Sequence, residues 1–200
     1  TAINAIGDRY VPVNRDLTRI DPSKKLILAT MHRRENIGDK MEIILKCLAT
    51  LADDGDKQIV LPVHMNPAVS EKVHEILDGK QNILLVEPLV YTDLVWILKQ
   101  AWTVISDSGG LQEEVPTLQI QMLITRDTTE RPEVIHSGFG FLVNDDFDLI
   151  VSKVRELTSD NDKIRVNQDN PFGDGNASVR IVNALINRNN NDTGTECNKS

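Results

Sequence analysis

The sequence has few cysteines, and none of them falls in a pattern that binds metal. Its two cysteines are Cys47, on the apolar side of an expected helix, and Cys197, in a polar carboxyl-terminal segment. We therefore expect no structural disulfide and a reducing, cytoplasmic environment. Because no cysteine and histidine spacing matches a metal site, we expect neither a metal nor a cofactor.

Long apolar runs and an excess of positive charge are also absent. The apolar runs are too short to cross a membrane. Thr1–Arg9 lacks the basic patch and the apolar stretch that a signal peptide has. The chain begins without Met, which indicates a fragment or a processed chain. Its net charge of −8 argues against sequence-independent binding to nucleic acid. The glycine patterns of dinucleotide-binding folds and P-loops are missing as well. We expect a protein that binds neither nucleic acid nor a membrane.

Short apolar segments instead alternate with amphipathic ones. The apolar segments, each expected to be a strand buried on both faces, are Lys25–Thr30, Gln58–Val63, Asn82–Val86, Trp102–Ser106, Gln121–Thr125 and Gly140–Val143. Helical periodicity is found in Met41–Leu51, Ala68–Leu77, Thr92–Gln100, Phe147–Leu157 and Ala177–Asn187. This alternation predicts an α/β fold with an open, doubly wound parallel sheet of the Rossmann-like type.

The composition divides the chain into three parts. Residues 1–23 are polar and fit a linker from a preceding domain. Residues 24–187 contain all the expected strands and helices. Residues 188–200 are rich in Asn, Asp and Thr and have nothing to bury, so we expect a disordered tail.

A polar segment rich in functional groups follows five of the expected strands. These segments are His32–Asn36, His64–Pro67, Glu87-Pro88, Asp107–Gly110 and Arg126–Glu133. The carboxyl ends of parallel strands lie along one edge of a sheet, where ligands bind. We therefore expect the functional site along this edge.

The segment that begins at Asp107 has the features of a phosphate site. Gly109 and Gly110 let the backbone approach a ligand, the helix start offers free N–H groups, and Ser108 adds a hydroxyl donor. Glu114, about one helical turn later, can accept hydrogen bonds from both hydroxyls of a ribose. The alternative interpretation is a tight turn followed by a helix cap.

Two other segments carry positive charge. His32 with Arg33 and Arg34 suits a developing anion such as a departing diphosphate, although a solvated charged turn explains the same residues. Arg126, nearest its strand end, is the best candidate for a phosphate contact, although much of its segment can form internal ion pairs. His64 either belongs to the site or orients a turn.

Together these segments resemble the non-hydrolysing UDP-N-acetylglucosamine 2-epimerases. The matching stretches, in the family's order, are Thr30–Gly38, Pro62–Pro67, Glu87–Leu89, Asp107–Pro116, Arg126–Glu133 and Asn170–Gly175. The resemblance implies the carboxyl-terminal half of a two-domain GT-B type fold. It also implies interconversion of UDP-GlcNAc and UDP-ManNAc by elimination and re-addition of UDP.

The resemblance assigns roles to individual residues. His32 matches the catalytic histidine, and the UDP-binding residues are matched by Ser108, Gly109, Gly110, Glu114 and Arg126. Arg33 and His64 match residues of an allosteric UDP-GlcNAc site that some bacterial members have. The acid and base carboxylates of the family lie in the amino-terminal half, so we expect the isolated chain to be inactive. Its expected partners are UDP, UDP-GlcNAc and that half, as a domain or a separate chain, within a homodimeric enzyme of polysaccharide synthesis.

The sequence departs from the family in its scaffold. Leu118–Gln121 occupies the place where the family usually has a Gly-Lys-Pro turn. Val134 replaces a Gly that is usual in the family, and Phe172 replaces a common Tyr. Two alternatives therefore stay open: half of a GT-B glycosyltransferase, or a non-catalytic remnant or binding module for UDP-sugars.

Overall fold

The computed structural model of the chain describes residues 3, 6–7, 9–31 and 38–192. Its strands are β1 (Lys25–Thr30), β2 (Lys57–Pro62), β3 (Ile83–Val86), β4 (Thr103–Ser106), β5 (Gln121–Ile124) and β6 (Gly140–Leu142). Its α-helices are α2 (Asp39–Asp53), α3 (Pro67–Leu77), α4 (Tyr91–Gln100), α5 (Gly109–Glu114), α6 (Pro132–His136), α7 (Phe147–Leu157) and α8 (Ala177–Asp192). The described residues also include the 3-10 helices η1 (Arg15–Arg19) and η3 (Val115–Leu118). The expected strands are confirmed, each to within one residue at either end.

The strands form one parallel sheet in the order β3-β2-β1-β4-β5-β6. β1 lies in the middle, paired on one side with β2 and on the other with β4. The order of strands therefore reverses between β1 and β4, as in a doubly wound fold. In such a sheet a ligand crevice opens at the carboxyl ends of the strands where the order reverses.

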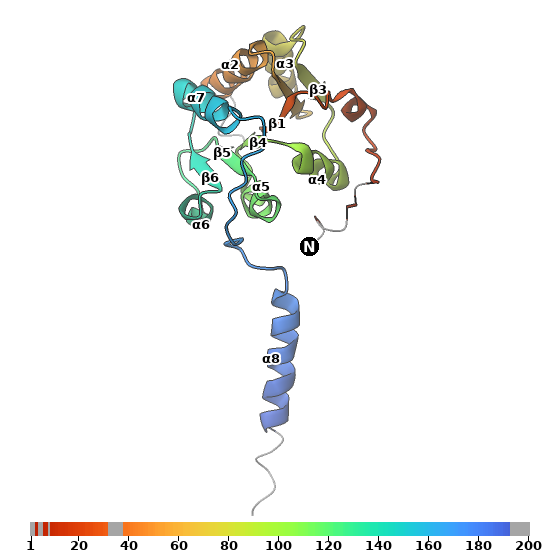
Figure 1. Ribbon diagram of the computed structural model, residues 1–200, viewed down its shortest axis with the longest axis vertical. Helices are drawn as coiled ribbons and strands as arrows, with labels where there is room; N and C mark the ends of the chain where they lie inside the picture. The colour runs from red at the N-terminus through yellow and green to blue at the C-terminus, as the bar shows by residue number, and fades with distance from the viewer. Residues whose placement is uncertain (1–2, 4–5, 8, 32–37, 193–200) are drawn as a thin grey trace, which may run out of the picture.

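Helices cover both faces of this sheet (Figure 1). α2, α3 and α7 lie on one face, and α4, α5 and α6 lie on the other. Alternate side chains of β1 point to opposite faces of the sheet. Leu26 and Leu28 pack toward α4, and Ile27 and Ala29 pack toward α2. Burying a side chain of leucine or isoleucine size stabilises the fold by roughly 1.5–3 kcal/mol.

The segment before β1, which we expect to be a linker, is packed on the domain. Leu17, on η1, is only 1% exposed and belongs to the core on the α4 side of the sheet. Asp93 of α4 accepts the backbone N–H groups of Val13 at 2.9 Å and Asn14 at 2.8 Å. The apolar residues of this segment follow neither a helical nor a strand period, which is why the sequence did not reveal this packing.

The last helix is longer than expected. α8 continues to Asp192, so residues 188–192 are helical rather than part of a disordered tail; residues 193–200 lie outside the described residues. Once a helix has nucleated, each further residue adds one hydrogen bond, and extension into a polar run needs no packing. Across the part of the chain that the structure describes, no helix combines the length and the apolar character that a membrane span requires.

Candidate functional site

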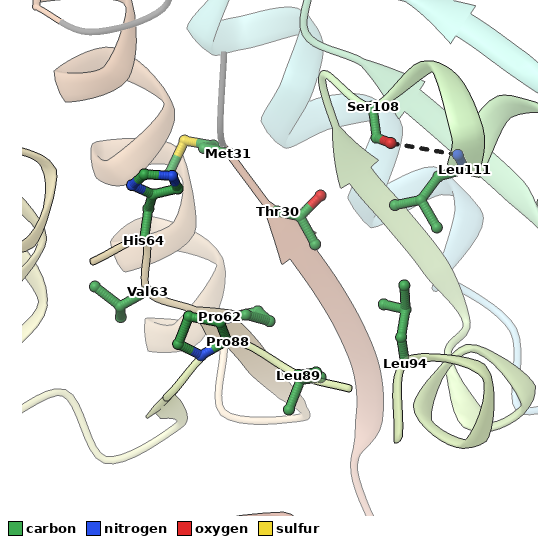
Figure 2. A pocket seen from close by; sticks show the side chains of 10 residues that line it. All are labelled: Thr30, Met31, Pro62, Val63, His64, Pro88, Leu89, Leu94, Ser108 and Leu111. Carbon is green, nitrogen blue, oxygen red and sulfur yellow. Dashed lines mark hydrogen bonds between the residues drawn. The ribbon is translucent and has the colours of Figure 1, made fainter. Parts of the chain in front are cut away.

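A cavity of about 310 Å³ lies at the edge of the sheet formed by the carboxyl ends of β1 to β4. Its lining consists of Thr30, Met31, Pro62, Val63, His64, Pro88, Leu89, Leu94, Ser108 and Leu111. In Figure 2, His64 and Ser108 stand on opposite sides, with Thr30 on the strand between them. A mainly apolar lining with a few polar groups is typical of a small-molecule site. The edge expected from the sequence is therefore hollow where strand order reverses.

Hydroxyl groups join the ends of β1 and β4 beneath this cavity. The hydroxyls of Thr30 and Ser106 are 2.6 Å apart, and Oγ of Ser106 accepts the backbone N–H of Ser108 at 2.9 Å. Ser106 is fully buried. These bonds fix the turn by which the chain leaves β4 and enters α5, so Ser108 has a defined position at the cavity wall.

Ser108 serves as the amino-terminal cap of α5. Its Oγ accepts the backbone N–H of Leu111 at 3.4 Å, which is the capping role of the alternative interpretation. Capping uses the oxygen as an acceptor, and the hydroxyl hydrogen stays available as a donor. The cap and a ligand contact are therefore compatible at this residue.

Gly109 lies under the side chain of Arg131. A Cβ at Gly109 would stand 2.7 Å from Nη1 of Arg131, whereas one at Gly110 would make only an ordinary contact of 3.8 Å with Oγ of Ser108. The absence of a side chain at Gly109 lets a guanidinium reach the start of α5. Arg131 also forms an ion pair with Glu113. Sequence reasoning did not single out Arg131, because its position over Gly109 depends on how the loop after β5 folds.

Glu114, at the end of α5, is half-buried and hydrogen-bonded to a tyrosine. The hydroxyl of Tyr91 donates to Oε1 of Glu114 at 3.0 Å. Burial raises the pKa of Glu114 above its ordinary value, and the bond from Tyr91 acts in the opposite direction. Among the described residues, the cavity lining includes Ser108 but neither Glu114 nor Arg126.

Arg126 is buried and ion-paired. Its side chain is 5% exposed and makes two hydrogen bonds to Glu130, at 2.7 and 2.6 Å. It borders a different hollow, of about 480 Å³, together with Asp127 and Asn144. The prediction of internal ion pairs in this segment is confirmed.

His64 lines both the first cavity and a neighbouring one of about 390 Å³. Its Nδ1 accepts the backbone N–H of Asn66 at 3.1 Å. The neutral ring therefore carries its proton on Nε2, and that nitrogen is a donor. His32 and Arg33, to which the resemblance assigns a catalytic and an allosteric role, lie outside the described residues.

Comparison with known proteins gives a consistent result along the chain. A family model described as UDP-N-acetylglucosamine 2-epimerase matches residues 2–186. The UDP-N-acetylglucosamine 2-epimerase of Escherichia coli K12 is 46% identical over 171 residues, which are 84% of this chain and 46% of that protein. The corresponding protein of Campylobacter jejuni is 37% identical over 194 residues, 96% of this chain and 49% of its own length. The chain thus spans about half the length of these relatives.

Solved structures that share the fold include two with bound nucleotide-sugar. The UDP-GlcNAc 2-epimerase of Neisseria meningitidis bound to UDP-GlcNAc superposes with a TM-score of 0.78 at 35% identity, covering 86% of this chain and 47% of that one. The enzyme of Methanocaldococcus jannaschii in complex with UDP-GlcNAc and UDP gives a TM-score of 0.70 at 27% identity, covering 86% and 48%. Both structures match this chain over about half of their own length.

Proposed function

The chain belongs to the UDP-N-acetylglucosamine 2-epimerase family, and from this premise we propose that it is the UDP-binding half of an enzyme that interconverts UDP-GlcNAc and UDP-ManNAc. The observation that carries the proposal is the cavity at the reversal of strand order, with Ser108 on one wall and His64 on the other. Ligands of open α/β sheets bind at this place.

The proposed chemistry is elimination followed by re-addition. The C2 hydrogen of the sugar is not next to a carbonyl, so its removal as a proton is coupled to cleavage of the bond between C1 and the diphosphate oxygen. The base carboxylate takes the C2 proton and UDP leaves with the bonding electrons; re-addition re-forms the bond from the diphosphate oxygen to C1 while an acid carboxyl group delivers a proton to the opposite face of C2. Stabilising the departing diphosphate is the task of this half.

Different residues bind the diphosphate, bind the ribose and assist departure of UDP. Ser108 and the backbone of Gly109 and Gly110 hold the diphosphate, with Arg126 as a further cationic contact. Glu114 accepts the ribose hydroxyls. His32 acts on the departing diphosphate, in keeping with the family's catalytic histidine.

A second UDP-GlcNAc is proposed to bind beside the first, with Arg33 and His64 as contacts. The support within the described residues is that His64 lines both cavities. Its Nε2–H suits a phosphate or hydroxyl oxygen at neutral pH.

Two features support the proposal that this carboxyl-terminal half acts together with an amino-terminal half. The chain spans about half the length of its curated relatives, and the acid and base carboxylates are assigned to the other half. α8 stands away from the sheet domain (Figure 1) and exposes an apolar side formed by Val179, Ile181, Val182, Leu185 and Ile186, each 52–59% exposed. We propose that the amino-terminal half covers this side in a homodimeric, cytoplasmic enzyme of polysaccharide synthesis.

The first test is a calorimetric titration of the chain with UDP. The Glu114→Ala and His32→Ala variants are expected to bind more weakly than the parent. Glu156→Ala, which removes the same charge from an exposed site at the end of α7, is the matched control and should bind like the parent. Equal affinity of all four proteins would contradict the proposed UDP site.

The second test supplies an amino-terminal half. The chain mixed with the amino-terminal half of a relative should exchange solvent deuterium into C2 of UDP-GlcNAc, and the chain alone should not. Binding of UDP by the mixture without such exchange would reject the epimerase and favour a binding module. Transfer of the sugar to an added acceptor would favour a glycosyltransferase.

A further inference from the structure

Tyr91 is the first residue of α4 and reaches across to the end of α5. Its hydroxyl donates a hydrogen bond of 3.0 Å to Oε1 of Glu114, and 45% of its surface is exposed. The hydroxyl of Tyr91 is therefore directed away from its own helix and toward Glu114.

The two neighbouring acids of α5 have different partners. Glu113 pairs with the guanidinium of Arg131, so its charge is neutralised within the protein. In the part of the chain that the structure describes, the side chain of Glu114 is hydrogen-bonded to Tyr91 alone. A neutral hydroxyl holds one carboxylate oxygen without cancelling the charge, which leaves Oε2 as a strong acceptor.

The turn that carries Tyr91 is held from its other side. The hydroxyl of Tyr10 lies 2.7 Å from both Oγ1 of Thr92 and Oδ1 of Asp93. Asp93 is 1% exposed and also accepts backbone N–H groups from Val13 and Asn14. Because the first turn of α4 is fixed in this way, Tyr91 can hold Glu114 in one orientation.

We infer that Tyr91 is a positioning residue that sets the preference of this site for a ribonucleotide over a deoxyribonucleotide. It fixes Oε1 of Glu114, so that Oε2 accepts the hydroxyls of the ribose. The inference rests on the ribose contact proposed above for Glu114, and it adds a residue and a specificity to that contact.

The chemistry of tyrosine suits this role. Burial and the bond to Glu114 raise the pKa of Tyr91 above its ordinary value, so the phenol keeps its proton at neutral pH. Burial raises the pKa of Glu114, and the hydroxyl bond opposes that rise. Phenylalanine at position 91 would keep the ring and remove only the donor, which makes Tyr91→Phe the informative substitution.

The test compares UDP with 2′,3′-dideoxy-UDP, which lacks both ribose hydroxyls. Tyr91→Phe is expected to weaken UDP binding roughly five-fold, as loss of one hydrogen bond does, and to leave the affinity for dideoxy-UDP unchanged. Combined with Glu114→Gln, Tyr91→Phe should have no additional effect. Equal losses for both nucleotides, or no loss for either, would overturn the inference.

Glu114→Gln separates this inference from the proposed function. If Glu114→Gln does not weaken binding of UDP more than binding of dideoxy-UDP, the proposed ribose contact is wrong and Tyr91 has no role in it. If Glu114→Gln selectively weakens UDP binding but Tyr91→Phe does not, only the inference about Tyr91 is rejected. A second measurement needs no nucleotide: the pKa of Glu114, followed by carbon NMR of its carboxyl group, should rise in Tyr91→Phe. An unchanged pKa would also reject the role of Tyr91.

Discussion

Arg126 holds Glu130 through two hydrogen bonds, from Nη1 to Oε2 at 2.7 Å and from Nη2 to Oε1 at 2.6 Å. The arginine side chain is 5% exposed, whereas that of Glu130 is 63% exposed. The carboxylate therefore sits at the solvent end of a buried cation. A phosphate that contacts this guanidinium has to share it with Glu130 or displace Glu130.

Glu130→Gln is expected to strengthen UDP binding about three-fold, because removing the competing negative charge leaves Arg126 more attractive to a phosphate. The same change should lower the free energy of unfolding by about 1 kcal/mol, since the buried cation loses part of its compensation. Titration calorimetry and urea denaturation measure the two effects. Glu133→Gln, on the exposed side of α6, is the control; weaker UDP binding by Glu130→Gln would argue against a phosphate contact at Arg126.

The fold was predictable because its strands are short, apolar on both faces and separated by helical periods. Lys25–Thr30 shows this well, since its four inner residues are all buried and its bounds agree with the prediction. The edge that carries the cavity followed from strand direction alone. Arg126 shows the limit of such reading, because an arginine at a strand end can face a ligand or an acid four residues later. Tyr91 was missed for a similar reason: its contact with Glu114 spans 23 residues of sequence.

Gln119 has a backbone conformation that non-glycine residues rarely adopt. The residue has φ 58° and ψ 31°, the left-handed region that favours glycine. Its amide donates to the backbone carbonyls of Pro116 at 3.1 Å and Gln168 at 2.8 Å, and its Oε1 accepts the N–H of Gln168. These bonds offset the cost of the backbone conformation, and β5 keeps its pairing with β4.

Gly140→Ala is expected to destabilise the protein by about 1–2 kcal/mol through overpacking. A Cβ at this residue would lie 2.9 Å from Cδ1 of Ile124 and 3.0 Å from Cγ1 of Val134. Val134→Ala removes the second of these two contacts and leaves that with Ile124, so the double variant should be more stable than the sum of the single effects predicts. Urea denaturation of the four proteins gives the coupling. Additive effects would show that Val134 does not restrict residue 140.

Cys47 is expected to resist thiol reagents in the folded protein. It is fully buried, and burial raises the pKa of its thiol to about 12. In a Cys197→Ser background, labelling by a disulfide reagent should therefore stay slow from pH 7 to 9 and become fast only in denaturant. Above pH 9 the unfolded thiol ionises before the folded one, so this group's contribution to stability should be lost as pH rises toward 12. Rapid labelling of the native protein would contradict the buried position.

The apolar side of α8 should matter for assembly and not for the stability of the isolated chain. Leu185 and Ile186 are 58% and 53% exposed, so Leu185→Asp and Ile186→Asp are expected to change the free energy of unfolding by less than about 0.5 kcal/mol. Each should weaken binding of the amino-terminal half at least roughly ten-fold, because a charge would replace a buried apolar contact. Asn187→Asp, which adds the same single charge to an exposed position on the other side of this helix, is the matched control. Unchanged affinity in both apolar variants would exclude this side of α8 as the interface.

Glu114→Gln is expected to stabilise the folded chain at neutral pH while it weakens UDP binding. A carboxyl group whose pKa is raised on folding binds its proton more tightly in the folded state than in the unfolded state. Burial raises the pKa of Glu114 above 4.5, so its ionised form costs stability at pH 7, and that cost disappears as pH falls below 4.5. Glutamine keeps the shape and an acceptor for Tyr91 without the charge.

Urea denaturation of both proteins at pH 7 and pH 4 measures this difference. Glu114→Gln should be the more stable protein at pH 7, and the two should converge at pH 4. Glu113→Gln is the control, because it removes an ion pair with Arg131 and should not stabilise the chain. Destabilisation by Glu114→Gln at pH 7 would mean that Glu114 stabilises the fold as a carboxylate. A carboxylate kept at the expense of stability is instead what a ligand-binding role predicts.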